Sequence, residues 1–168
     1  SGELSAISSW TDGDGSVDGL AGVSSLAISP DGQHVYTAAS TDNAIGVFQK
    51  TSGFLSEETV SSTADGAVSV FAIDVDGDGD TDILSASQYD DTIAWHENDG
   101  NQVFTERVIT SDANMANSVY AVDVDGDNDI DVLSASDTDN TIAWYENNGS
   151  QVFAEHVISS TANRAREV

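Results

Sequence analysis

The sequence of 168 residues contains no cysteine, which excludes disulfide bonds, thiolate nucleophiles, iron–sulfur clusters and cysteine-based zinc sites. Only 4 lysine and arginine residues stand against 30 aspartate and glutamate residues, so the net charge is −26. Nucleic acids and anionic lipid surfaces are bound through clustered cationic side chains, and neither is therefore an expected partner. No apolar run approaches the roughly 18 residues that a membrane-spanning helix needs, and we expect no membrane insertion.

A repeat of 49 residues organises the chain. Residues 69–117 and 118–166 align without a gap, and 32 of the 49 aligned positions are identical. A more divergent copy begins at residue 24 and has a shorter first turn. A repeat of this length is typical of architectures in which each unit buries its apolar surface against its neighbours.

Each copy predicts four short strands. In the second copy the strand-like runs are followed by turns rich in Asp, Asn and Gly, and no segment has helical periodicity. The predicted strands of this copy are 70–75, 83–86, 92–95 and 102–110, and the third copy repeats them 49 residues later. Four strands in about 49 residues is the size of one β-propeller blade. We therefore predict an all-β chain of about three blades, each made of four antiparallel strands.

The ends of the sequence continue the repeat. The predicted blades occupy residues 20–60, 66–112 and 116–160. Residues 1–10 resemble the fourth strand of the first copy, and residues 161–168 resemble the start of a blade. Closed propellers have about four to eight blades, so three blades cannot close a ring. We expect this chain to be part of a longer propeller, or half of one that forms by self-association.

Two loops concentrate the acidic residues. DVDGDGDTD at 74–82 and DVDGDNDID at 123–131 place aspartate at every second position. Such carboxylates repel one another without a cation, and Ca²⁺ takes six to eight oxygen ligands. The sixth loop position holds Gly79 or Asn128, which both tolerate a left-handed backbone. An acidic turn that binds nothing is the alternative, but the duplication at one blade position favours two Ca²⁺ sites over Mg²⁺ or transition-metal sites.

These loops and their surroundings resemble the FG-GAP/VCBS repeats of integrin-α-type β-propellers, over residues 61–168. The resemblance implies calcium binding between the first two strands of a blade. It also implies that the seventh-position residues, Asp80 and Asp129, contribute a backbone carbonyl. The implied side-chain ligands are Asp74, Asp76, Asp78 and Asp82 in the first loop, and Asp123, Asp125, Asp127 and Asp131 in the second.

The first blade departs from this pattern. Its turn, SPDGQ at 29–33, lacks the series of carboxylates and resembles the turns of WD-repeat and lactonase-type propellers. We expect no calcium site in that turn. The acidic segment DGDGSVD at 12–18 precedes the first strand of its blade, so it is out of frame with the other two loops and is not expected to bind a cation.

No residue pattern predicts catalysis. The nucleophile motif GxSxG is absent. The three histidines lack catalytic or zinc-binding spacing, and we expect surface strand positions for His34, His96 and His156. Trp95 and Trp144 share one position of the repeat and are expected to pack between sheets rather than on sugars, whereas Trp10 is the better candidate for an exposed aromatic ring.

These observations favour a non-catalytic, calcium-binding propeller module of a secreted or cell-surface protein, used for adhesion or for recognition of a protein or glycan. The alternatives are the propeller part of an extracellular enzyme, such as a polysaccharide lyase or a lactonase-type hydrolase, and a lectin. The loops that join blades, and those that join second and third strands, are rich in Ser, Thr, Asp and Asn and suit a polar partner.

Overall fold

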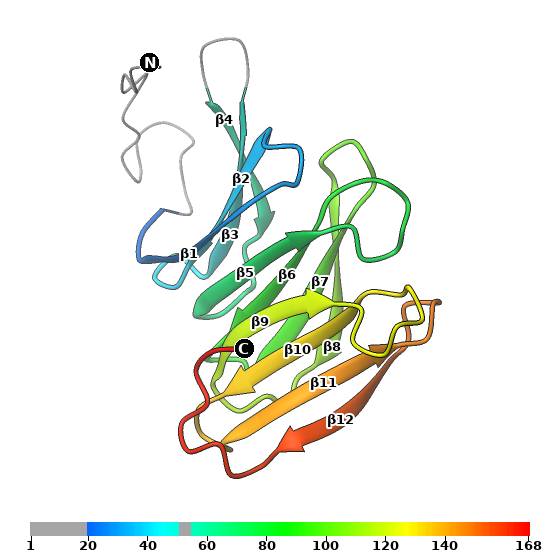
Figure 1. The fold of residues 1–168 in the computed structure, drawn as a ribbon. Coiled ribbons are helices and arrows are strands. Elements are labelled where there is room, and N and C mark those ends of the chain that lie inside the picture. Colours follow the sequence, from blue (N-terminus) through cyan, green and yellow to red (C-terminus); the bar gives the residue numbers. More distant parts are fainter. Residues whose placement is uncertain (1–19, 51–54) are drawn as a thin grey trace, which may run out of the picture.

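The structure is a computed structural model that describes residues 20–50 and 55–168, and their regular structure is entirely β. Twelve strands form three four-stranded antiparallel sheets, in each of which consecutive strands are neighbours (Figure 1). The first sheet consists of β1 (Val23–Ile28), β2 (His34–Ala39), β3 (Ala44–Lys50) and β4 (Leu55–Ser61). This confirms the all-β prediction and the four-stranded antiparallel unit.

The second and third sheets repeat this arrangement with almost the same strand lengths. The second sheet consists of β5 (Ala67–Ile73), β6 (Asp82–Ser87), β7 (Thr92–Asn98) and β8 (Phe104–Thr110). The third consists of β9 (Ala116–Val122), β10 (Asp131–Ser136), β11 (Thr141–Asn147) and β12 (Phe153–Ser159). The first strands of the three sheets, β1, β5 and β9, lie next to one another (Figure 1). The residues for which we predicted an additional strand (1–10), a poor cation site (12–18) and an exposed Trp10 lie outside the described residues.

The core lies between the sheets rather than within one of them. Tyr36 and Ile45 of the first sheet pack with Ile83 of the second in one apolar cluster. Leu84 and Trp95 belong to a second cluster, which joins the second and third sheets. The Trp95 side chain is 2% exposed, which confirms the expected packing between sheets, whereas Trp144 is half-buried on the third sheet.

The same hydrogen bonds link each sheet to the segment that follows it. A serine near the start of a first strand accepts a bond from the backbone N–H of a valine about 45 to 50 residues later, at 3.3 Å in every case. The pairs are Ser25 with Val70, Ser69 with Val119, and Ser118 with Val168. Residues 161–168 are therefore bonded to the third sheet in the same way as β5 is bonded to the first sheet and β9 to the second.

The outer faces of the first and third sheets carry exposed apolar side chains. At the equivalent positions of the second sheet, the side chains are buried between sheets. Leu26 is 64% exposed, but Val70, at the same register position of the second sheet, is 6% exposed. Val75 is 3% exposed, but Val124, its equivalent 49 residues later, is 43% exposed. Among the described residues, nothing covers these two faces as the sheets cover one another.

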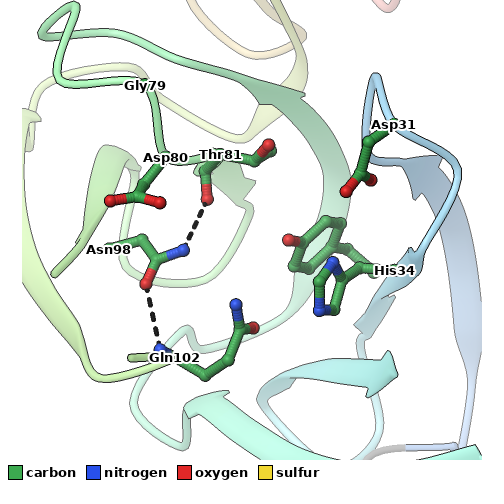
Figure 2. Close-up of a pocket in the computed structure, with 8 residues that line it drawn as sticks. Asp31, His34, Gly79, Asp80, Thr81, Asn98 and Gln102 are labelled. Atoms are coloured by element: carbon green, nitrogen blue, oxygen red, sulfur yellow. Dashed lines mark hydrogen bonds between the residues drawn. The ribbon is translucent and has the colours of Figure 1, made fainter. Parts of the chain in front are cut away.

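One cavity of about 110 Å³ lies between the first and second sheets (Figure 2). It is at the end of the sheets that carries the loop between β5 and β6. Its lining residues are Asp31, His34, Tyr36, Gly79, Asp80, Thr81, Asn98 and Gln102. In the part of the chain that the structure describes, no helix has the length and apolar character to cross a membrane.

Candidate metal centre

The loop between β5 and β6 curls because its own carboxylates accept hydrogen bonds from its backbone. Asp74 Oδ1 accepts from the N–H of Gly77 at 2.7 Å, and its Oδ2 accepts from the N–H of Gly79 at 3.0 Å. Asp76 and Asp78 each accept from the N–H two residues further on. Aspartate side chains commonly fix turns in this way. The loop therefore holds its carboxylates on the inside of a tight curl.

The loop between β9 and β10 has the same bonds at the same distances. Asp123 accepts from the N–H groups of Gly126 and Asn128 at 2.7 and 3.0 Å. The backbone is left-handed at the sixth position of both loops, with φ of 97° at Gly79 and 76° at Asn128. This confirms the prediction for these two residues and explains why asparagine can replace glycine there.

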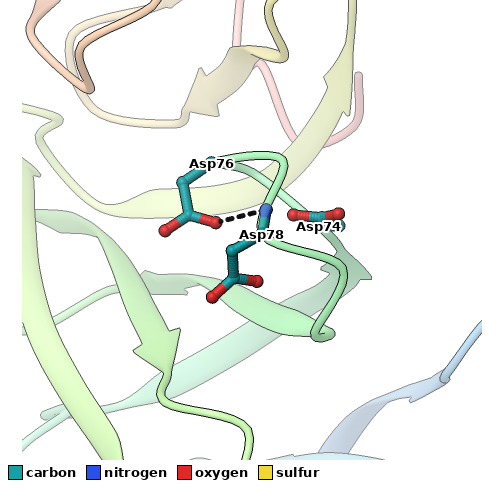
Figure 3. A group of neighbouring side chains, drawn as sticks. All are labelled: Asp74, Asp76 and Asp78. Atoms are coloured by element: carbon teal, nitrogen blue, oxygen red, sulfur yellow. Dashed lines mark hydrogen bonds between the residues drawn. The ribbon is translucent and has the colours of Figure 1, made fainter.

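Each loop brings three carboxylates together. In the first loop the residues are Asp74, Asp76 and Asp78 (Figure 3), and each offers an oxygen within 4.8 Å of the others. Two oxygens bound to one Ca²⁺ at about 2.3–2.6 Å are at most about 5.2 Å apart, so this spacing fits a single Ca²⁺ ion. The second loop satisfies the same limit with a slightly different set, Asp123, Asp125 and Asp131.

The ninth loop position anchors the loop to its sheet. Asp82 is fully buried, and its two carboxylate oxygens accept from the N–H groups of Val75 at 3.0 Å and Asn98 at 2.8 Å. Asp131 makes the equivalent bonds to Val124 and Asn147. Burial raises the pKa of Asp82 to about 6. Asp82 therefore joins the loop to β7, a role that the metal-ligand assignment did not include.

The remaining predicted ligands are placed unequally. Asp78 is part of the first triad, but its equivalent Asp127 is outside the second. The carboxylates of Asp80 and Asp129 lie against Gly100 and Gly149, where a Cβ atom on the glycine would be within 2.6 Å of an oxygen. Both side chains thus turn toward the next hairpin. This position is compatible with the implied role of Asp80 and Asp129 as backbone-carbonyl ligands.

Electrostatics in the loops favour a cation. Burial raises the pKa of Asp76, and the neighbouring carboxylates of Asp78 and Asp74 raise it further, although a backbone hydrogen bond opposes the shift. Asp125 in the second loop has a pKa raised by the same kinds of interaction. Both causes, burial and neighbouring negative charge, disfavour the ionised carboxylate. A divalent ion bound at the triads would supply a compensating positive charge.

Comparison with known proteins bears on this arrangement. A family model described as an FG-GAP-like repeat matches residues 74–134 and 123–168. The chain belongs to the FG-GAP-like repeat family. Both matches begin at the first aspartate of a curled loop, so the family signature and the candidate metal centre coincide. No curated protein sequence matches the chain significantly.

The FG-GAP-like chain also resembles solved structures. A putative 6-phosphogluconolactonase from Bacteroides fragilis has 16% identity and a TM-score of 0.58 over 84% of this chain and 40% of its own. A second protein of that description, from Bacteroides uniformis, has 14% identity and a TM-score of 0.59 over 79% of this chain and 39% of its own. At this identity the likeness shows the fold, a β-propeller. The chain spans about two fifths of the length of these two structures.

One histidine expectation is wrong. His96 is 1% exposed rather than on the surface, because it occupies the position at which Tyr145 packs into the core of the next interface. His96 Nε2 and Ser85 Oγ are 3.0 Å apart, as the Tyr145 hydroxyl is hydrogen-bonded to Ser134. The surface position predicted for His156 is confirmed, since its side chain is exposed beside Glu146. His34 is half-buried in the wall of the cavity.

Two structural residues were missed by the sequence reasoning. Asn98 is 2% exposed, donates to the carbonyl of Thr81 at 3.1 Å and accepts from the N–H groups of Gly100 and Gln102. Asn147 does the same in the third sheet. Both hold the hairpin that follows the third strand against the metal loop. Their identity in the two copies, two residues before a glycine, was the available signal.

Proposed function

We propose that this chain is a calcium-binding, non-catalytic β-propeller module of a secreted or cell-surface protein, and that it recognises a protein or a glycan. The observation that carries the proposal is the duplicated acidic curl. Two loops 49 residues apart form the same hydrogen bonds and gather carboxylate oxygens within 4.8 Å. The ions would be held by Asp74, Asp76 and Asp78, and by Asp123, Asp125 and Asp131.

The chemistry of the donors favours calcium. Each triad offers only carboxylate oxygens, and the backbone carbonyls of Asp80 and Asp129 are the further ligands that the family resemblance implies. Transition metals prefer nitrogen or sulfur ligands, and Mg²⁺ retains several waters in a strict octahedron. A bound Ca²⁺ would neutralise the mutual repulsion of the carboxylates. Sites of extracellular modules bind calcium with a Kd of about 10⁻⁴ to 10⁻³ M, which suits the millimolar calcium outside cells.

Calcium should stabilise the fold, because the metal loops connect the first and second strands of two sheets. A ligand that binds only the folded state at about 100 times its Kd adds about 2.7 kcal/mol per site to the free energy of unfolding. We therefore expect the thermal midpoint to rise with calcium and to fall after chelation. Unfolding is followed by circular dichroism at 2 mM chelator and over a calcium series.

Matched variants locate the effect. Asp78→Asn and Asp125→Asn each remove one charge from one triad and should reduce the calcium-induced rise in midpoint. Asp112→Asn removes an exposed charge outside both loops and should leave that rise unchanged. A midpoint that ignores calcium in the unmodified protein, or a rise that all three variants retain equally, would rule out the proposed sites.

We further propose that residues 161–168 begin another blade, which would cover the third sheet. The bond between Ser118 and Val168 and the exposure of Val124 support this. The covering blades would come from the remainder of a longer propeller or from a second copy of this chain. Light scattering after gel filtration tests whether a second copy supplies the covering blades. A dimer would support self-association, whereas a monomer at high concentration would exclude it and favour a longer propeller.

The enzymatic alternative has less support in the described residues. The buried titratable groups Asp82, Asp131 and His96 are engaged in hydrogen bonds that hold loops and sheets together. The likeness to the two Bacteroides structures is a likeness of fold. Hydrolysis of 6-phosphogluconolactone, or cleavage of a polysaccharide, by the purified protein would overturn the non-catalytic part of the proposal.

A further inference from the structure

The hairpin between β11 and β12 carries the sequence Asn-Gly-Ser at residues 148–150. An asparagine followed by any residue except proline and then by serine or threonine is the acceptor motif for N-linked glycans. The chain contains this motif once. Short motifs also occur by chance, so the exposure and the hydrogen bonds of the asparagine decide whether it can serve as an acceptor.

The hairpins of the second and third sheets differ only at the positions that create the motif. The second hairpin reads ENDGNQVF from residue 97, and the third reads ENNGSQVF from residue 146. Asn148 occupies the position of Asp99. Ser150 occupies the position of Asn101. The motif needs both replacements, since one supplies the amide group and the other supplies the hydroxyl.

The turn itself does not need these replacements. Asn148 Oδ1 accepts hydrogen bonds from the N–H groups of Ser150 at 3.0 Å and Val152 at 3.4 Å. Asp99 Oδ1 accepts the equivalent two bonds at 2.9 and 3.3 Å. An aspartate therefore fixes this turn as well as an asparagine does. The asparagine adds its Nδ2 amide group, which has no hydrogen-bond partner among the described residues.

The motif is accessible, and it would remain so if another sheet covered the third. Asn148, Gly149 and Ser150 are all exposed. The equivalent residues 99–101 are exposed as well, although the third sheet packs on the second. A sheet that packed on the third in the same way would therefore leave the motif open to solvent. Figure 1 shows the hairpin at the edge of the molecule, next to the loop between β9 and β10.

We propose that Asn148 is the acceptor for an N-linked glycan. The proposal rests on the secretion or cell-surface location proposed above, because the oligosaccharide is transferred in the secretory pathway from a lipid pyrophosphate donor. Asn148 Nδ2 loses a proton and bonds to the anomeric carbon of the first sugar, while the bond from that carbon to the pyrophosphate breaks and the lipid pyrophosphate leaves. The linkage uses only Nδ2, so both hydrogen bonds to Oδ1 persist.

The position of the glycan has a consequence for recognition. Gly149 lies against the carboxylate of Asp129 in the second metal loop. The glycan would therefore project from the end of the third sheet that carries the calcium site. Because N-linked glycans are bulky and solvated, they would shield this end of the sheet from a protein partner.

Mass spectrometry of the secreted protein tests the proposal. The full chain, preceded by a cleavable signal peptide, is produced in a eukaryotic secretory host and recovered from the medium. Most chains should carry a glycan on the peptide that contains Asn148. Peptide-N-glycosidase in heavy-oxygen water should release the glycan and leave an oxygen-labelled aspartate at that position, which separates glycosylation from deamidation that occurred earlier.

Matched variants assign the glycan to the motif. Ser150→Ala removes only the hydroxyl and should abolish the glycan, whereas Ser150→Thr keeps the motif and should retain it. Asn148→Asp copies the second hairpin, so it should lose the glycan and keep the same thermal midpoint. Asp99→Asn combined with Asn101→Ser builds the motif in the second hairpin and should add a second glycan.

A secreted chain without a glycan, or a glycan that persists in Ser150→Ala, would overturn the proposal. The calcium sites are tested separately, since calcium binding can be measured on the Asn148→Asp variant, which carries no glycan. A secreted chain that binds calcium but lacks the glycan would refute the glycan alone. A glycosylated chain that binds no calcium would refute the calcium-binding function and leave the glycan in place.

Discussion

Replacing His96 by tyrosine should remove a large part of the acid sensitivity of this protein. His96 is 1% exposed at the interface of the first and second sheets, and burial lowers its pKa from 6.5 to about 4. The folded protein therefore keeps this imidazole neutral, while the unfolded chain protonates it below pH 6.5. Stability from the neutral imidazole is fully present above pH 6.5 and is lost progressively as the pH falls toward 4.

The size of the loss follows from the two pKa values. With 6.5 in the unfolded and about 4 in the folded chain, His96 should cost about 2.5 kcal/mol of unfolding free energy between pH 7 and pH 4.5. His96→Tyr is the natural substitution, because Tyr145 occupies this position in the next sheet and bonds to Ser134 as His96 bonds to Ser85. Tyrosine does not titrate in this range.

Urea unfolding at pH 7 and pH 4.5, at saturating calcium, provides the test. The loss of stability between the two pH values should be about 2.5 kcal/mol smaller in His96→Tyr than in the unmodified protein. His156→Tyr is the matched control, because His156 is exposed beside Glu146. Equal pH dependence in His96→Tyr and the unmodified protein would refute the reasoning, and His96→Phe repeats the test without the phenolic hydroxyl.

Two further predictions concern the two tryptophans of the repeat and one surface ion pair. Trp95→Ala should lower the free energy of unfolding by about 3–5 kcal/mol, whereas Trp144→Ala, at the same position of the uncovered sheet, should lower it clearly less. Urea unfolding measures both losses, and equal losses would contradict the packing of Trp95 between sheets. The ion pair between Arg107 and Glu97 is solvent-exposed on the arginine side, so a double-mutant cycle should give a coupling energy below about 1 kcal/mol. A larger coupling energy would show that the pair is better shielded from water than its exposure indicates.

The repeat made most of the fold predictable. Alignment of two copies located the strands because turn residues interrupt β-branched runs at the same places in both. The predicted first strand of the second sheet, 70–75, differs from β5, Ala67–Ile73, because β5 starts in the segment that enters the blade and ends where Asp74 begins the curl. The left-handed backbone at Gly79 and Asn128 was also predictable, since few other residues tolerate it.

Several roles that depend on the folded environment of a side chain were not predictable. The sequence places Asp82 in an acidic series, but only the folded loop shows that its carboxylate accepts hydrogen bonds from the backbone N–H groups of Val75 and Asn98. His96 gives no local signal of burial, because strands covered on both faces lose the alternation that would distinguish an inward residue. The cavity combines Tyr36 with Gln102, which are 66 positions apart in the chain.

Direct counting of bound calcium tests the central claim most closely. Equilibrium dialysis against radioactive calcium, over a range that extends to millimolar concentration, gives the number of ions per chain. The duplicated curl predicts two ions in the unmodified protein, and one when Asp74→Asn and Asp76→Asn are combined so that only the loop at 123–131 remains intact. Fewer than two ions in the unmodified protein, or two ions that survive the loss of both carboxylates, would contradict it.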